Sequence, residues 1–537
     1  MPLINKELLA NTPKEVISKK IVFYCLILSF SGGLHGFNTS NISGVLAMTS
    51  FKKHFGLNHM STTGVSNITG WITSSLLLGS CVGALMCAPF NDRLGRKYSL
   101  ALFSLVYCLA AILMSANPGG NGGIDEFLAG RVLSGLGSGA ASVIGTSYIA
   151  EIAPKPIRGG LAAMYNANTM LGVAMGYWIN YGSIENISKT KNAQWQVPMA
   201  MMILPGVILI VGLFFMPESP RWLIGRGRME EAYKSLEDLR SLSRDHDFVR
   251  NEFEEIRISS EHEGEDNAGR KLSVISELMT PSIRKRLALV MVIQVFFQFS
   301  GGNIITYYNT SILTSIGLTA PSTNYLFSGI YGLVKVLTLV FYSTLLVDRL
   351  GRRIMLFIGT GIIVASLIYI TAYLAIVHPG TSSATSPSAA GWVALVAIYV
   401  FAIGYAISWA TVPWIINSEV FPQRLRATCM SICITWQYLV NFALTRAQPN
   451  MVLSMHPWGP FALFACATTL GGVYSYFCLP ETKGMSMEHM DQLFEVPWYR
   501  VGLTSLNVVE LNQEHEVAAA KEANELEEIE WRAPTKS

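Results

Sequence analysis

Twelve long apolar runs dominate this 537-residue chain. A helix that crosses the hydrocarbon core of a bilayer needs about 20 mostly apolar residues, and each run is close to that length. The runs are 21–47, 69–90, 98–116, 127–149, 160–182, 197–216, 287–314, 324–347, 354–377, 391–416, 427–449 and 458–479. Because lipid offers no hydrogen bonds to the backbone, these runs predict an all-α membrane protein with twelve transmembrane helices.

The composition excludes several other classes of protein. Charged residues make up 14% of the chain and hydrophobic residues 51%, whereas soluble domains carry about 25% charged residues. A net charge of +3 without a basic block argues against a nucleic-acid partner. The lipid bilayer is therefore the expected partner. The sequence shows no pattern of catalytic, metal-ligating or nucleotide-binding residues, so we expect neither an enzyme nor a cofactor.

Three motifs recur in the same order along the chain. They are D-R-L-G-R-[KR] at 92–97 and 348–353, E-x-x-P-x-x-x-R at 151–158 and 419–426, and P-E-[ST] at 217–219 and 480–482. Three recurrences at nearly one spacing predict two homologous six-helix pseudo-repeats. Internal symmetry of this kind is typical of carriers in which one half rocks against the other around a central site.

The distribution of basic residues predicts the orientation, because cytosolic loops are enriched in Lys and Arg. The short loops after the second, fourth, eighth and tenth runs are basic, whereas 117–126 and 315–323 carry no Lys or Arg. The expected parts are a cytosolic N-terminus (1–20), an N-terminal half (21–216), a cytosolic helical loop (217–286), a C-terminal half (287–479) and a cytosolic tail (480–537). Asn186 in an N-x-S triplet then faces outside and is a glycosylation candidate.

The repeated motifs place Arg and Glu side chains at helix ends on the cytosolic side. Exposed ion pairs contribute only ~0–1 kcal/mol each, which suits contacts that break in every transport cycle. The predicted cytosolic latch consists of Asp92, Arg93, Arg96, Glu151, Arg158, Asp348, Arg349, Arg352, Glu419 and Arg426. The alternative is that the Arg residues serve only to orient the chain in the membrane.

These motifs resemble the signatures of the sugar porters of the major facilitator superfamily. The resemblance rests on the two D-R-L-G-R-[KR] segments, 217–223, Q-x-S-G-x-N at 298–303, and 480–484, and it extends over residues 20–495. The segment 329–335 is most similar to the fungal branch with hexose, quinate and uronate carriers. The resemblance implies the major facilitator fold, alternating access and a small sugar or sugar-like substrate.

Amide side chains inside the apolar runs are the candidate substrate ligands, since an amide offers a donor and an acceptor to a hydroxyl. Gln294 and Gln298 are four residues apart and share one helix face. The resemblance implies that Gln298 and Asn303 contact the sugar ring. It adds contacts at Asn166, Trp414 and Asn441. The alternative role of such amides is to hold neighbouring helices together.

Lys335 is a charge in the middle of the run 324–347. An intramembrane charge is a functional candidate, because a buried ion is costly. Lys335 could hold the carboxylate of quinate or a uronate, or a carboxylate of the protein itself. Phe297 and Asn166 stand where the family usually has Gln, so the substrate is left open.

Asn38 and Arg131 occupy the coupling position implied by the resemblance. Proton-coupled members pair an Asp on the first helix with an Arg on the fourth, and here the Asp is replaced by Asn38. Because Asn does not titrate, the sequence favours facilitated, uncoupled transport of a monosaccharide or related polyol. The alternatives are a proton symporter of a sugar acid such as quinate or galacturonate, and a non-transporting sugar sensor. In each case we expect a multi-pass protein of the plasma membrane.

Overall fold

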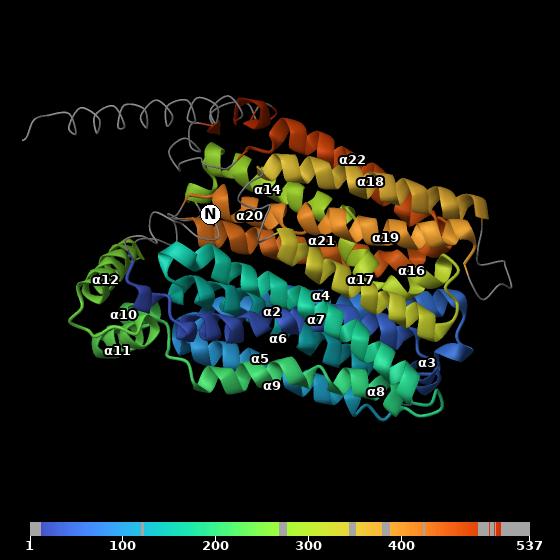
Figure 1. Ribbon diagram of the computed structural model, residues 1–537, viewed down its shortest axis with the longest axis horizontal. Coiled ribbons are helices and arrows are strands. Elements are labelled where there is room, and N and C mark those ends of the chain that lie inside the picture. The colour runs from blue at the N-terminus through green and yellow to red at the C-terminus, as the bar shows by residue number, and fades with distance from the viewer. Residues whose placement is uncertain are drawn as a thin grey trace, which may run out of the picture.

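The computed structural model describes residues 12–119, 123–267, 276–342, 351–377, 387–422, 425–481, 493–494, 499 and 501–505. Within these ranges the chain forms helices and no strand, which confirms the predicted all-α fold. Figure 1 shows two layers of long helices side by side. The first half of the chain (blue to green) forms the lower layer, and the second half (yellow to red) forms the upper one.

The first half begins with the short 3₁₀ turn η1 and continues through eight α-helices. They are α2 (Lys19–Ala47), α3 (Thr49–His54), α4 (Thr62–Leu94), α5 (Arg96–Ser115), α6 (Gly123–Ile152), α7 (Arg158–Asn186), α8 (Ala193–Ala200) and α9 (Ile203–Phe214). Serine side chains cap two of the spanning helices. Ser18 accepts a hydrogen bond from Ile21 N–H at the start of α2, and Ser61 accepts one from Gly64 N–H at the start of α4.

Three shorter helices follow the first half and pack together at one end of the bundle (Figure 1). They are α10 (Pro220–Gly225), α11 (Met229–Arg240) and α12 (Asp247–Asn267). A small apolar core that includes Leu223, Leu236 and Phe253 joins them. We call this end of the bundle the loop end, and the opposite end, where α3 lies, the α3 end.

The second half repeats the architecture of the first. Its helices are α14 (Pro281–Phe299), α15 (Gly302–Tyr307), α16 (Asn309–Ser315), α17 (Pro321–Phe341), α18 (Arg352–Val377), α19 (Ala389–Ile407), α20 (Val412–Glu419), α21 (Arg426–Ser454) and α22 (Gly459–Cys478). Proline occupies the first turn of α14 and α17. The N–H groups of a first turn have no intrahelical partner, so the lack of an N–H in proline costs no hydrogen bond there.

Ten helical segments of the described residues are long and apolar enough to cross a membrane. The two remaining runs form α7 and α21, which have 29 residues each but are more polar. Both lie where the halves meet, since α7 packs against α17 and α21 packs against α4. Packing between helices on several sides allows these two segments to be more polar than the others. With these two, the predicted arrangement of twelve spanning segments is confirmed.

The seventh spanning segment is broken into α14, α15 and α16. At the first break Gly301 has φ +84°, a left-handed conformation that glycine adopts without steric cost. A Cβ at this position would also lie 2.9 Å from the ring of Phe464. The break brings the side chain of Asn303 back onto Gln298, five residues earlier.

Hydrogen bonds between the two halves gather toward the α3 end. Thr310 Oγ1 of α16 donates to the Ser43 carbonyl of α2 at 2.7 Å. The hydroxyl of Tyr325 on α17 donates to the Gly44 carbonyl at 2.6 Å. The halves are thus closed against each other at this end.

Candidate functional site

Gln298 and Asn303 form the centre of the candidate site. Asn303 Nδ2 donates to Gln298 Oε1 at 2.9 Å across the Gly301 break. Gln298 is 1% exposed, and its Nε2 has no partner among the described residues. One turn closer to the loop end, both polar atoms of Gln294 are also buried and unpartnered. An unsatisfied buried amide costs about 1–3 kcal/mol, which a substrate hydroxyl could recover.

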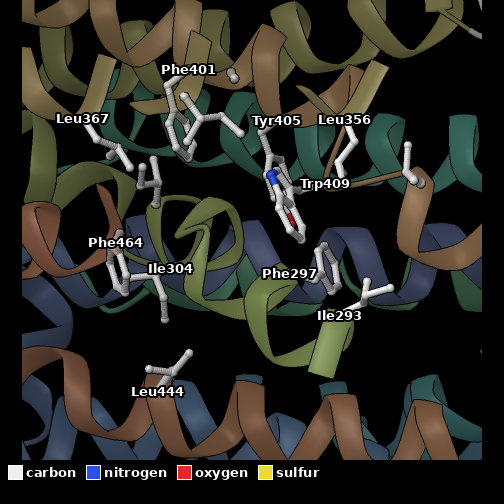
Figure 2. Packing of buried hydrophobic residues seen from close by; sticks show 14 of the residues in the cluster. Ile293, Phe297, Ile304, Leu356, Leu367, Phe401, Tyr405, Trp409, Leu444 and Phe464 are labelled. Atoms are coloured by element: carbon white, nitrogen blue, oxygen red, sulfur yellow. The ribbon is translucent and has the colours of Figure 1, made fainter. Parts of the chain in front are cut away.

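Tyr405 of α19 connects this amide pair to an aromatic wall. Its hydroxyl donates to Asn303 Oδ1 at 3.3 Å. Its ring is nearly parallel to those of Phe297 and Phe401, at 7° and a centroid distance of 6.1 Å in each case. Figure 2 shows these three rings within the buried cluster of the second half. Flat apolar rings of this kind suit the C–H face of a sugar-like ring.

Lys335 of α17 is a further neighbour of Tyr405. Its Nζ donates to Thr306 Oγ1 at 3.0 Å and lies 5.6 Å from the ring centroids of both Tyr331 and Tyr405. The residue is 2% exposed, and none of the described carboxylates pairs with it. The aromatic faces offset part of the cost of burying the ammonium group. Lys335 is therefore a cation with further hydrogen-bonding capacity, and it shares the neighbour Tyr405 with the amide of Asn303.

Among the described residues, the other predicted substrate contacts make no hydrogen bond to Gln298, Asn303 or Lys335. Asn441 on α21 is buried, and its Oδ1 accepts a hydrogen bond from Thr445 Oγ1 at 3.1 Å. Trp414 on α20 is half-buried, and Asn166 on α7 is exposed. Within the described ranges, neither hydrogen-bonds to Gln298 or Asn303. The binding roles of Asn166, Trp414 and Asn441 remain predictions.

Asn38 and Arg131 are in direct contact in the core of the first half. Arg131 Nη1 donates to the side-chain oxygen of Asn38, and its Nε donates to the Ile72 carbonyl at 3.0 Å. Asn38 Nδ2 in turn donates to Ser134 Oγ at 3.0 Å. Arg131 and Asn38 are both fully buried. The guanidinium is thus bound by neutral oxygens that do not titrate.

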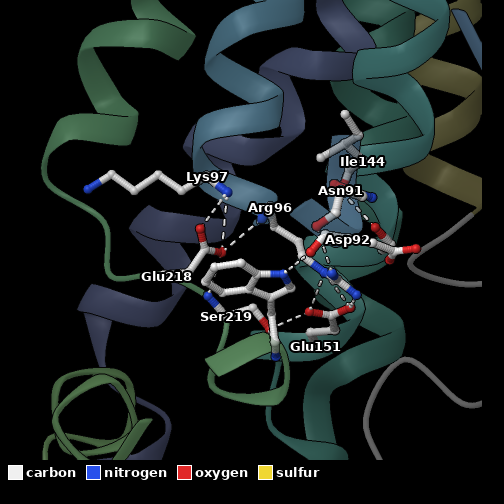
Figure 3. A network of polar contacts seen from close by, with 10 residues as sticks. Asn91, Asp92, Arg96, Lys97, Ile144, Glu151, Glu218 and Ser219 are labelled. Atoms are coloured by element: carbon white, nitrogen blue, oxygen red, sulfur yellow. Dashed lines mark hydrogen bonds and ion pairs between the residues drawn. The ribbon is translucent and has the colours of Figure 1, made fainter. Parts of the chain in front are cut away.

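Figure 3 shows the part of the predicted latch that lies in the first half. Arg96 donates to both carboxylate oxygens of Glu151 at 3.0–3.1 Å. Ser219 also donates to Glu151. Glu218 accepts hydrogen bonds from the backbone N–H groups of Arg96 and Lys97 at 3.0 and 3.2 Å. Burial raises the pKa of the Glu218 carboxyl, and these N–H groups oppose that shift.

The second half repeats these contacts, as the repeated motifs lead one to expect. Arg352 donates to Glu419 at 3.1 Å. Glu481, the counterpart of Glu218, accepts from the backbone N–H groups of Arg352 and Arg353 at 3.1 Å each. The Arg96–Glu151 and Arg352–Glu419 pairs each join helices of a single half. In this conformation the network braces each half internally, and its role as a latch remains a prediction.

Two other predicted latch residues donate hydrogen bonds to backbone carbonyls. Arg158 donates to the Ala153 carbonyl, and Arg426 donates to the Phe421 carbonyl in the equivalent way. The side chains of Asp92 and Arg93 are exposed, although the Asp92 carbonyl accepts a hydrogen bond from Trp222 Nε1 at 3.0 Å. Asp348 and Arg349 lie outside the described residues. The glycosylation candidate Asn186 is exposed at the end of α7, toward the α3 end.

Sequence reasoning missed two groups of residues. Glu218 and Glu481 lie in the recurring P-E-[ST] motif, so the repeat itself carried the signal for their matching roles. Tyr405 and Thr306 carried no such signal. Their contacts join α19, α15 and α17, and packing between helices leaves no periodicity in one segment.

The bracing network gives a stability prediction. Glu151→Gln removes the charge of a carboxylate that is only 12% exposed in its pair with Arg96. We expect the free energy of unfolding to fall by about 1–3 kcal/mol. Glu255→Gln is the matched control, because its pair with Lys155 is 53–61% exposed, where a pair contributes only ~0–1 kcal/mol. Thermal unfolding of both variants in detergent tests this, and equal losses would contradict it.

A family model described as "Sugar (and other) transporter" matches residues 24–494. The chain is 35% identical over 488 residues to a probable quinate permease of Neosartorya fischeri, covering 90% of this chain and 89% of that protein. It is 34% identical over 487 residues to a quinate permease of Neurospora africana, covering 90% of each.

The fold is similar to that of a solved bacterial carrier. The xylose transporter XylE of E. coli, in a partially occluded inward open conformation, matches with a TM-score of 0.72 and 24% identity. The match covers 88% of this chain and 100% of that chain. At this level of identity the likeness shows the shared fold and nothing about the substrate.

Proposed function

The chain belongs to the sugar transporter family of the major facilitator superfamily, and from this premise we propose that it carries a hydroxylated carboxylate of the quinate class by uncoupled alternating access. One observation carries the proposal: Lys335 is buried beside Tyr405, and the hydroxyl of Tyr405 bonds to Asn303. The quinate permeases among its relatives support the same substrate class.

Each group of the cluster has a role in this proposal. The Lys335 ammonium binds the substrate carboxylate, replacing part of its hydration with a charge-assisted hydrogen bond. Gln298, Asn303 and Gln294 bind the ring hydroxyls through amide atoms, several of which are unpartnered in this structure. Tyr405 packs against the C–H face of the ring and keeps the carboxylate and hydroxyl subsites adjacent.

The charge balance of the bundle supports an anionic substrate. The buried cations of the described spanning helices are Arg131, Arg286, Lys335, Arg352 and Arg353. Among the described residues, Glu481 is the one fully buried carboxylate, and it is engaged by backbone N–H groups at the loop end. A buried charge without a counter-ion costs several kcal/mol. A bound carboxylate lowers that cost, whereas a neutral sugar leaves it unchanged.

A neutral monosaccharide or polyol is the second candidate substrate. It is favoured by the contacts that Lys335 already makes with Thr306 and with the two tyrosine rings, which need no anion to hold the ammonium group. Competition separates the candidates. Uptake of labelled quinate into proteoliposomes should be blocked by excess quinate and resist excess glucose. The reverse pattern would favour the neutral substrate, and no uptake of either would favour the sensor.

Uncoupled transport rests on the contact between Asn38 and Arg131, since neither side chain exchanges a proton near neutral pH. We expect a pH gradient imposed across proteoliposomes to leave the final accumulation of substrate unchanged. Because the substrate carries a negative charge, a membrane potential should matter instead. About 100 mV corresponds to 2.3 kcal/mol per charge, or about fiftyfold in the equilibrium distribution.

The matched variant for this prediction is Asn38→Asp, which places a titratable carboxylate against Arg131. Accumulation by this variant should respond to the pH gradient, whereas accumulation by the unmodified protein should not. Accumulation that follows the pH gradient in the unmodified protein would overturn uncoupled transport and point to a proton symporter.

We also propose the orientation and location of the carrier. The loop end and both termini face the cytosol, and the α3 end faces outside. The basic residues of the short loops support this orientation. Uptake of an external nutrient acid makes the plasma membrane the natural location.

A further inference from the structure

At the α3 end, α4 and α21 meet in a contact that centres on an arginine held by an amide oxygen and an aromatic ring. We define the α4–α21 seam as Asn67, Gly70 and Trp71 of α4 with Arg446 and Asn450 of α21. Arg446 Nη2 and Asn450 Nδ2 both donate to Asn67 Oδ1 at 3.2 Å. The Arg446 guanidinium also lies over the Trp71 ring, 4.8 Å from its centroid. One acceptor and one ring of the first half thus hold a cation of the second half.

The backbones of the two helices also approach closely in the seam. A Cβ at Gly70 would lie 2.8 Å from the Arg446 carbonyl oxygen, so a larger residue would push α21 away. The Trp71 ring also contacts the Phe442 ring, with centroids 6.2 Å apart. The seam can therefore exist only while the α3 end is closed.

The partners of Arg446 are neutral, which distinguishes the seam from the ionic pairs at the loop end. None of the described carboxylates pairs with Arg446, and the residue is half-buried. Breaking the seam leaves the guanidinium free to take up water, with no stranded counter-ion. Contacts of this kind can hold a closed state and still release it in every cycle.

We propose that Arg446, held by Asn67 and the Trp71 ring, sets how much of the carrier stays closed at the α3 end and thereby controls its return to accept substrate from that side. The inference requires alternating access but does not depend on which substrate is carried. Weakening the seam shifts the population toward the form that is open at the α3 end. The apparent affinity for substrate on that side rises with the fraction of protein in the competent form.

A cysteine reporter measures this opening directly. Ser43 lies 3% exposed in the contact between the halves, so Ser43→Cys should react with a thiol reagent only when the α3 end opens. Seven of the eight native cysteines are buried, and the reporter protein also carries Cys466→Ser to remove the exposed one. In detergent-purified full-length protein, Arg446→Gln and Trp71→Leu should each raise the labelling rate of the reporter about three- to thirtyfold.

The controls distinguish the seam from general effects of charge or of misfolding. Lys189→Gln removes a cation from an exposed position toward the same end and should leave labelling unchanged. Trp71 is 44% exposed, so Trp71→Leu should fold even if Arg446→Gln does not. If Arg446 and Trp71 act as a unit, the reporter in the double variant Arg446→Gln/Trp71→Leu should be labelled no faster than in the faster of the two single variants.

Transport gives an independent readout of the same shift. In proteoliposomes, both variants should lower the KM for substrate on the α3 side and raise it on the loop side. Unchanged labelling and KM in both variants would overturn the proposal. Faster labelling in a protein that carries no tested substrate would uphold the seam and refute the proposed function, so the two can fail separately.

Discussion

Lys335→Met is expected to reduce uptake of a hydroxylated carboxylate by about thirtyfold to more than a thousandfold. Removing one partner of a buried, hydrogen-bonded charge pair costs about 2–5 kcal/mol, and each 1.4 kcal/mol is a factor of ten. Methionine has a similar length and fills the space between the Tyr331 and Tyr405 rings. The measurement is initial uptake of labelled quinate into proteoliposomes at equal pH on both sides.

The stability of Lys335→Met should not fall, although its uptake does. In the empty carrier Lys335 is a buried cation that no described carboxylate balances, so replacing it with an apolar side chain removes a desolvation cost. We therefore expect an unfolding temperature at least as high as that of the unmodified protein. A loss of uptake with lower stability would indicate damaged folding.

Lys189→Met is the matched control for Lys335→Met, because Lys189 is exposed and distant from the amide pair in sequence. It should transport normally. Lys335→Arg keeps the charge but changes its shape, and we expect partial uptake. Normal quinate uptake by Lys335→Met would remove the basis for an acid substrate and favour the neutral monosaccharide.

Gln298→Ala is expected to produce the second large effect, a loss of uptake of about thirty- to a hundredfold. The substitution removes a buried donor without another partner and also the acceptor for Asn303 Nδ2. A site built to hydrogen-bond hydroxyl groups loses about 1–3 kcal/mol for each polar group left unpaired. Asn303→Ala should lose a similar amount, because Tyr405 then loses its acceptor as well.

Asn168→Ala separates substrate binding from simple helix packing. Asn168 is a buried amide of α7 that donates to Ser29 Oγ of α2 at 2.9 Å, and among the described residues it makes no hydrogen bond to Gln298 or Asn303. This variant should lose thermal stability but keep the KM of the unmodified protein. Equal effects of Gln298→Ala and Asn168→Ala on KM would mean that Gln298 holds helices together and does not bind substrate.

The sequence was most informative where a signal was local. The spacing of Gln298 and Asn303 identified two amides that meet in the structure, although the bond depends on a helix break at Gly301. Lys335 was conspicuous because a charge inside an apolar run is rare. Apolar runs fixed the number of spans because a bilayer permits so few alternatives.

Contacts between helices could not be read from any single segment. Nothing marked Tyr405 among the 21 tyrosines of the chain, because its role comes from where α19 packs against α15 and α17. For the same reason the sequence did not reveal that the Arg96 and Arg352 pairs join helices of one half. Motif matching named the residues, whereas tertiary packing decided their partners.

The attachment of α10–α12 has a practical consequence for imaging. Lys20 pairs with Asp238, Arg240 donates to the Ile152 carbonyl at 2.8 Å, and Trp222 donates to the Asp92 carbonyl. These bonds fasten the three-helix unit to the first half. A small antibody fragment raised against the exposed faces of α11 and α12 would therefore act as a rigid fiducial that reports the orientation of the first half in electron micrographs.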